Sequence, residues 1–160
     1  MKSLTNILFL NIFLTFLCAG NIRADEVLYT FNGESAGDHF GGSVSGAGDV
    51  NGDGYADVIA GTAWGNYARV FSGIDGSILY TFDGDSVGDK FGASVSGAGD
   101  INKDGYADVI VGAYADDNNG EHSGSARVFS GVDGSILYTF YGDSFEDQFG
   151  HSVSGAGDVN

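Results

Sequence analysis

The chain repeats itself, and this periodicity constrains its fold more than any other feature. Residues 28–61 align with residues 79–112 at an offset of 51 positions, and 26 of those 34 positions are identical. Residues 137–160 align with residues 79–102 at an offset of 58, and 18 of 24 positions are identical. The seven extra residues (58 − 51 = 7) fall in one loop, residues 113–125. An insertion confined to one loop is typical of stacked structural repeats.

Each repeat is predicted to contain four short β-strands. Runs of β-branched and aromatic residues bounded by glycine and aspartate are strand signals. The 28 glycines and the absence of proline suit short strands joined by tight turns. In the second repeat the expected strands cover 77–82, 92–98, 107–112 and 126–129, and 130–134 forms a hairpin turn. Four strands in about 50 residues is the size of a propeller blade, so the predicted fold class is all-β, with four-stranded antiparallel blades.

The predicted domain organisation is a repeat region over residues 25–160. Its repeats run over about 28–78, 79–136 and 137–160. The third repeat stops halfway through its most distinctive motif, so the chain holds about two and a half blades, whereas propellers close with about 4–8. We therefore expect a partial propeller whose further blades are missing from this chain or supplied by self-association.

Residues 1–24 are predicted to be a secretory signal peptide. A positive start at Lys2 is followed by an almost wholly apolar run from Ile7 to Cys18, which is too short to span a bilayer. Small residues follow, so cleavage is expected after Gly20 or Ala24. The prediction is a secreted protein, extracellular or at the cell surface, with no membrane insertion after cleavage.

The acidic balance of the chain excludes some classes of partner. Six basic residues stand against 22 acidic ones, and the net charge is −16. Such a charge opposes binding to nucleic acid and to anionic membranes. Bound divalent cations would relieve the repulsion within a compact fold. Cys18 is the only cysteine and lies in the predicted signal peptide, so no disulfide or cysteine-ligated metal is expected in the mature chain.

A nine-residue aspartate-rich segment occurs twice and is the candidate calcium site. Oxygen-bearing side chains occupy positions 1, 3, 5 and 9, and a glycine at position 6 permits a sharp turn. Ca²⁺ takes six to eight oxygen ligands, often including a backbone carbonyl, for which we expect the tyrosine at position 7. The apolar residue at position 2 is expected to anchor the loop in the core. The candidate ligands are Asp49, Asn51, Asp53, Tyr55 and Asp57 in the first copy, and Asp100, Asn102, Asp104, Tyr106 and Asp108 in the second.

The candidate loop differs from an EF-hand. An EF-hand needs a carboxylate at position 12 and flanking helices. Position 12 is Ala60 or Val111, inside a strand-like run, so Asp57 and Asp108 are expected to supply the closing carboxylates. A third copy contains only Asp158 and Asn160 and is predicted to be incomplete.

The repeats resemble the FG-GAP repeat of integrin α-subunit propellers and many bacterial surface proteins. Phe-Gly pairs at 40–41, 91–92 and 149–150 precede the aspartate segments, and Gly-Thr-Ala or Gly-Ala-Tyr follows two of them. The resemblance covers residues 27–160, although the proline of the family's final Gly-Ala-Pro is absent. It implies a seven-bladed propeller with Ca²⁺ in loops on one face and ligand recognition on the other.

The predicted function is therefore an extracellular calcium-dependent binding or cell-adhesion module for a protein or glycan ligand. No recurring Ser, His and Asp constellation suggests an enzyme, and the partial match at residues 150–154 lacks the closing glycine of a nucleophile elbow. Two alternatives remain: the repeat portion of a larger secreted enzyme of the phospholipase-D-like kind, or a purely structural surface repeat. Trp64, Tyr67 and Tyr114 lie in the variable loops, where they form a partner surface or cover the blade edge. Residues 116–119 are expected at a solvated loop tip.

Overall fold

The computed structural model describes residues 27–157, and within this range the chain forms eight β-strands. That part of the chain contains no helix, and hence none long and apolar enough to cross a membrane. The predicted signal peptide and the partial third segment at Asp158 and Asn160 lie outside the described residues. The strands are β1 (Ser43–Gly48), β2 (Asp57–Thr62), β3 (Tyr67–Phe71), β4 (Ile78–Asp83), β5 (Phe91–Gly99), β6 (Asp108–Ala113), β7 (Ser125–Phe129) and β8 (Ile136–Tyr141).

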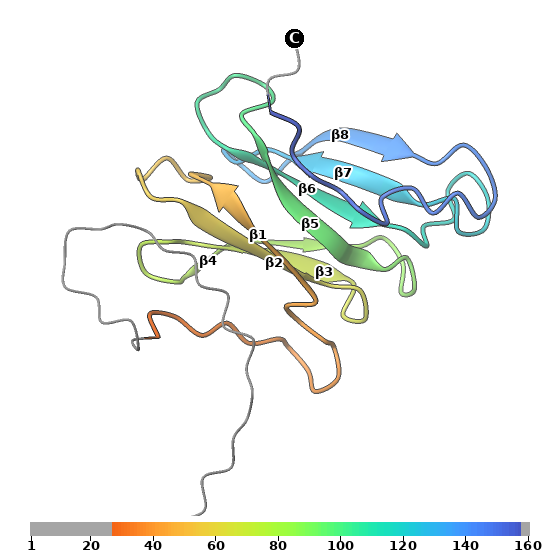
Figure 1. The fold of residues 1–160 in the computed structure, drawn as a ribbon, viewed down its shortest axis with the longest axis horizontal. Coiled ribbons are helices and arrows are strands. Elements are labelled where there is room, and N and C mark those ends of the chain that lie inside the picture. Colours follow the sequence, from red (N-terminus) through yellow and green to blue (C-terminus); the bar gives the residue numbers. More distant parts are fainter. Residues whose placement is uncertain (1–26, 158–160) are drawn as a thin grey trace, which may run out of the picture.

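The strands form two four-stranded antiparallel sheets of the same topology (Figure 1). The first sheet has the order β1-β2-β3-β4 and the second β5-β6-β7-β8. The predicted all-β class with four-stranded antiparallel blades is confirmed, and every expected strand is present within two residues of its predicted bounds. Grouping the strand at 77–82 with the second repeat was wrong, because β4 pairs with β3 of the first sheet. A sequence period has no intrinsic starting point, so the repeat alone cannot assign this strand.

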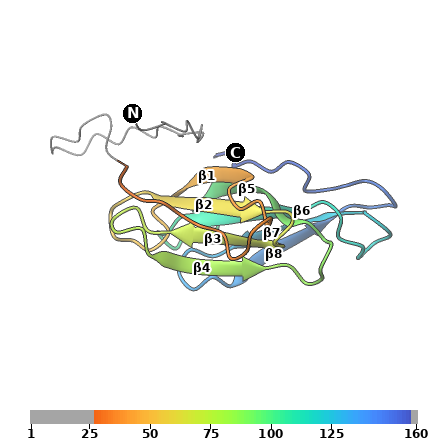
Figure 2. The ribbon, with the colours of Figure 1, turned by 90° about the horizontal axis from the view of Figure 1, so that it is seen from below.

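The two sheets pack face to face as neighbouring layers (Figure 2). The core between them draws on both sheets and includes Ile59, Val70, Phe91, Val109 and Phe129. Close contact of the backbones requires glycine where β2 meets β5, since a Cβ at Gly61 would overlap the carbonyl oxygen of Gly92. Gly112 meets the carbonyl oxygen of Gly150 in the same way, so the third Phe-Gly pair lies against β6 as the second pair, at the start of β5, lies against β2.

The outer strand β4 also contributes to the interface between the sheets. The ring of Phe82 stacks on Phe129 with 4.0 Å between centroids. The hydroxyl of Tyr80 donates a hydrogen bond of 2.8 Å to the carbonyl oxygen of Gly131. The first sheet therefore packs its outer strand, as well as its inner strands, onto the second sheet.

Residues 27–33 make similar contacts on the first sheet, although they form no strand. Phe31 stacks on Phe71 at 4.0 Å, and the hydroxyl of Tyr29 donates to the carbonyl oxygen of Ile74 at 2.6 Å. Tyr29 and Phe31 are one repeat before Tyr80 and Phe82. This segment therefore occupies the place of the outer strand of a preceding sheet.

The outer strand of the second sheet, β8, exposes aromatic side chains that are more buried at the equivalent positions of β4 in the first sheet. Phe82 is 6% exposed, whereas the equivalent Phe140 on β8 is 46% exposed. Tyr138, one repeat after Tyr80, is also exposed, and its ring stacks on Phe140 with 6.2 Å between centroids. The second sheet thus presents an apolar face of the kind that β4 buries against the second sheet.

Candidate metal centre

The two predicted calcium segments form matching loops at the same end of the two sheets. The first aspartate loop (residues 49–57) connects β1 to β2, and the second aspartate loop (residues 100–108) connects β5 to β6. A β-bulge precedes each loop, at Gly46–Gly48 in β1 and at Gly97–Gly99 in β5. Because the bulge recurs at the same position, both strands enter their loops with the same geometry.

The side chains at positions 1, 3 and 5 fold back onto the loop that carries them. In the first loop the carboxylate of Asp49 accepts hydrogen bonds from the backbone N–H groups of Asp53 (3.0 Å) and Gly54 (2.9 Å). The Asn51 amide donates to Asp53 at 2.8 Å, and Asp53 accepts from the N–H of Tyr55 at 2.9 Å. Gly54 has a φ of 87°, a left-handed conformation that favours glycine. The second loop repeats these four bonds within 0.1 Å, at Asp100, Asn102 and Asp104.

The aspartates at position 9 are buried and brace the backbone. Asp57 is the first residue of β2, and its two carboxylate oxygens accept from the N–H groups of Val50 (2.8 Å) and Gly73 (2.9 Å). Asp108 accepts from Ile101 (2.8 Å) and Gly131 (3.0 Å). Each carboxylate therefore ties its loop to the turn after the third strand of the same sheet. The sequence reasoning missed this bracing role, and the only available signal was the position of the aspartate at the start of an apolar strand.

Electrostatics at the first loop favour a cation. Burial raises the pKa of the Asp57 carboxyl, and its two backbone hydrogen bonds oppose that shift. The nearby charges of Asp53 and Asp49 raise the pKa of Asp57 further. A divalent cation beside these three carboxylates would offset their mutual repulsion.

The donor chemistry of the loops suits a hard cation. Every candidate side-chain ligand offers oxygen, and no nitrogen or sulfur ligand competes, as Ca²⁺ prefers. Within residues 27–157, however, no three acidic, histidine or cysteine side chains converge in a metal-holding cluster. Asp49 and Asp53 instead use their oxygens on loop N–H groups. The residues of each loop fit Ca²⁺ by type and spacing, and ligation by them, including the carbonyls of Tyr55 and Tyr106, stays a prediction.

The two aspartate loops are in direct contact. The N–H of Ala107 donates to the carbonyl oxygen of Asp49 at 2.9 Å. The ring of Tyr106 lies against Gly52, where a Cβ would approach ring atom Cε1 to 2.5 Å. The two loops are therefore joined by a backbone hydrogen bond and by the packing of Tyr106 on Gly52. Val50, at position 2, is 1% exposed as predicted, whereas the equivalent Ile101 is 45% exposed because it lies in the last described sheet.

The variable loops lie at the opposite end of the sheets. Trp64, between β2 and β3, is 70% exposed, and the Lys90 ammonium lies 3.9 Å from the centroid of its ring. Tyr114 packs against His151 at 5.1 Å between ring centroids. The prediction that Tyr67 lies in a loop was wrong: it is the first residue of β3, is buried, and donates to Asp38 at 2.9 Å. Trp64 is thus the large aromatic side chain most available to a partner at this end.

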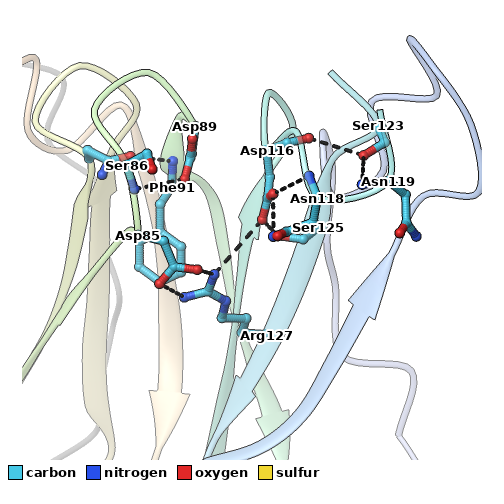
Figure 3. A network of polar contacts seen from close by, with 11 residues as sticks. Asp85, Ser86, Asp89, Phe91, Asp116, Asn118, Asn119, Ser123, Ser125 and Arg127 are labelled. Atoms are coloured by element: carbon cyan, nitrogen blue, oxygen red, sulfur yellow. Dashed lines mark hydrogen bonds and ion pairs between the residues drawn. The ribbon is translucent and has the colours of Figure 1, made fainter. Parts of the chain in front are cut away.

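The inserted loop of the second repeat contains a polar network around the buried Asp116, while residues 117–119 are exposed as expected of a loop tip (Figure 3). Asp116 is 3% exposed and accepts from the side chains of Asn118 (2.6 Å) and Ser125 (2.6 Å). Arg127 pairs with Asp85 through both of its terminal nitrogens and lies 3.9 Å from Asp116. The expectation of a solvated position therefore fails for Asp116, because Ser125 and Arg127 on β7 bind its carboxylate inside the fold.

Comparison with known proteins identifies the repeats. Residues 40–78 and 91–129 each match the family model described as FG-GAP repeat. These two ranges begin at the Phe-Gly pairs and contain both aspartate loops. The chain is an integrin-α-like FG-GAP repeat protein. Its two sheets are the blade-like units that the resemblance implied.

Several relatives of this FG-GAP chain are integrin α subunits. Human integrin alpha-11 is 32% identical over 131 residues, which are 74% of this chain and 11% of the relative. Integrin alpha-4 of Xenopus laevis is 28% identical over 138 residues, 79% of this chain and 13% of the relative. Integrin alpha-PS5 of Drosophila melanogaster is 37% identical over 100 residues, 54% of this chain and 10% of the relative. The chain therefore spans only about a tenth of the length of these relatives.

Proposed function

We propose that this FG-GAP chain is a secreted calcium-binding module for extracellular binding or cell adhesion. The observation that carries the proposal is the pair of matching aspartate loops, each braced by a buried carboxylate. Similarity to integrin α subunits supports the adhesive role, and the acidic net charge of −16 supports a need for cations. The proposed place of action is outside the cell or at its surface, and no catalytic role is proposed.

In this proposal, Ca²⁺ supplies the positive charge that offsets the clustered carboxylates of each loop. Asp49, Asn51 and Asp53 would hold it in the first loop, with the carbonyl of Tyr55 and the carboxylate of Asp57. The equivalent residues would hold it in the second loop. The contact of Tyr106 with Gly52 would then keep the two blades in a fixed relation. Further repeat units, in the same chain or in a second copy, would cover the exposed face of β8.

Calcium is expected to stabilise the chain through two sites. At a free Ca²⁺ concentration about 100 times the dissociation constant, one site contributes about 2.7 kcal/mol to the free energy of unfolding. Isothermal titration calorimetry should find two Ca²⁺ per chain, and thermal melting should shift upward. The double variant Asp53→Ala with Asp104→Ala should lose the shift, because both position-5 carboxylates are gone. A chelator-insensitive melt with zero bound Ca²⁺ would remove the metal from the proposal.

The binding role is tested at the end opposite the aspartate loops. Immobilised chain is expected to bind at least one member of a panel of purified matrix proteins and glycans, and Trp64→Ala should weaken that binding. Val132→Ala is the matched control, since Val132 is 50% exposed but lies at the aspartate-loop end. Surface plasmon resonance measures both variants. Equal loss in the two variants, or none in Trp64→Ala, would move the ligand away from the Trp64 end.

A further inference from the structure

The two aspartate loops differ at one position that matters for backbone chemistry. The sequences Asp49-Val-Asn-Gly-Asp53 and Asp100-Ile-Asn-Lys-Asp104 place glycine after Asn51 and lysine after Asn102. The side-chain bonds of the two asparagines are otherwise the same: each Oδ1 accepts from the N–H two residues later at 3.1 Å. The loops therefore form a natural matched pair for an asparagine followed, or not followed, by glycine.

We infer that Asn51 is a site of spontaneous deamidation and that Asn102 is protected from it. The Gly52 nitrogen loses its proton and bonds to Cγ of Asn51. The Cγ–Nδ2 bond then breaks, and Nδ2 takes up a proton and leaves as ammonia. Water opens the resulting five-membered succinimide at either carbonyl, which gives aspartate or isoaspartate. Glycine favours the reaction because it has no Cβ to crowd the attacking nitrogen.

The geometry of the first loop supports this reaction. Among the described residues, nothing accepts a hydrogen bond from the N–H of Gly52, so the attacking nitrogen has no bond to break. The N–H of Asp53 donates to Oδ1 of Asn51 at 3.1 Å, where negative charge develops as the amide is attacked. Asn51 is half-buried, and Gly52 and Asp53 beside it are exposed, so water can reach the succinimide from the Gly52 side.

The chain has two other Asn-Gly pairs, at residues 32–33 and 119–120, and the hydrogen bonds of the pair at 119–120 provide the contrast. At Asn119-Gly120 the N–H of Gly120 is bound to the carbonyl oxygen of Asp117 at 3.1 Å. The side-chain amide of Asn119 donates to the carbonyl oxygen of Gly142 at 3.0 Å. Attack at Asn119 would break both bonds, so the folded chain should protect Asn119 although its sequence is equally susceptible.

The consequence falls on one loop. Isoaspartate carries the main chain through its side-chain carbon, which inserts one methylene between Asp49 and Asp53. The spacing of positions 1, 3 and 5 is then lost in the first aspartate loop, while the second keeps it. Isoaspartate would therefore accumulate in the first aspartate loop and not in the second, and it would alter the contact that Gly52 makes with the second loop.

The test is peptide mapping by mass spectrometry of the folded chain, incubated at neutral pH well below its melting temperature. The fragmentation method must separate isoaspartate from aspartate. Among Asn51, Asn102 and Asn119, it should find conversion at Asn51, with Asn102 and Asn119 intact. The same chain in denaturant should convert Asn119 as well. Folded chain that converts Asn119 as fast as Asn51, or that leaves Asn51 intact while the denatured chain converts it, overturns the inference.

The Lys103→Gly variant tests the cause. It gives the second loop the same Asn-Gly pair, and Asn102 should then convert at a rate comparable with Asn51. Lys103 already has a φ of 62°, which glycine adopts without strain, so the variant should fold. An unchanged Asn102 in this variant would overturn the inference.

Calcium separates this inference from the proposed function. If Ca²⁺ binds Asn51, it should slow conversion at that residue severalfold. If the rate of conversion at Asn51 is the same with and without Ca²⁺, that result counts against the calcium site and supports the deamidation site. Absence of conversion with and without Ca²⁺ would remove the modification site and leave calcium binding to the calorimetric test.

Discussion

Replacing Phe91 by alanine should lower the free energy of unfolding by about 3–5 kcal/mol. Phe91 is 0% exposed and lies between the two sheets, edge-on to Phe129 at 6.1 Å between centroids. The guanidinium of Arg127 lies 5.6 Å above its ring. Truncation would leave a cavity that rigid neighbouring strands cannot close, so both the apolar transfer energy and the packing are lost. Urea denaturation monitored by circular dichroism measures the change.

The third repeat supplies the control for this prediction. Phe149 is equivalent to Phe91 in sequence but is 43% exposed. Phe149→Ala should cost less than half as much as Phe91→Ala. Equal costs would mean that the apolar face of the second sheet is covered in solution, and that the interface between the two sheets is not the main source of stability.

Replacing Asp57 by alanine should cost about 3 kcal/mol even without calcium, since two hydrogen bonds to a charged acceptor are lost. The N–H of Val50 is buried and would have no partner, and the N–H of Gly73 would lose its link to β2. Relief of repulsion with Asp49 and Asp53 offsets part of this cost. Denaturant unfolding in excess chelator isolates the bracing role from any metal.

Asp53→Ala is the comparison for the bracing role. Asp53 is exposed, and its bonds lie within the loop, so in chelator its replacement should cost within about 1 kcal/mol. In calcium both variants should lack the metal-dependent stabilisation, because each removes a proposed ligand, so the difference between them should stay as it is in chelator. If Asp57→Ala were as mild as Asp53→Ala in chelator, the buried carboxylate would be dispensable to the fold.

The strands and the positions of the aspartate loops could be predicted because each sequence pattern occurs in more than one copy of the repeat. A β-branched or aromatic run that recurs with the same flanking glycines is a stronger signal than a single run. Asp57 and Asp108 were predicted to be site residues for the same reason. Their backbone hydrogen bonds were not foreseen, since Gly73 and Gly131 lie in a different turn and nothing local in the sequence links them to the loop.

Other differences arise from packing between sheets. Val50 and Ile101 occupy the same position in their loops. Only Val50 is buried, because the second sheet packs against the face of the first sheet that carries it. Tyr67 was placed in a loop because its neighbours vary between repeats, but its ring and hydroxyl belong to the first sheet. Asp116 appeared solvated in an acidic run, and only the fold brings Arg127 and Ser125 to it. A periodic sequence thus predicts each element better than it predicts which neighbour covers it.

The stacking of Tyr80 and Phe82 on the following sheet has a consequence for how such proteins change length. Each added repeat presents the same contact surface as the repeat before it, so a further repeat can pack on it through the same contacts. Duplication or loss of a whole period preserves every interface between sheets. A break within a period leaves the tyrosine and phenylalanine of an outer strand without a sheet to pack on. Variation in the number of repeats is therefore expected to occur in whole periods, with sequence novelty confined to the exposed turns.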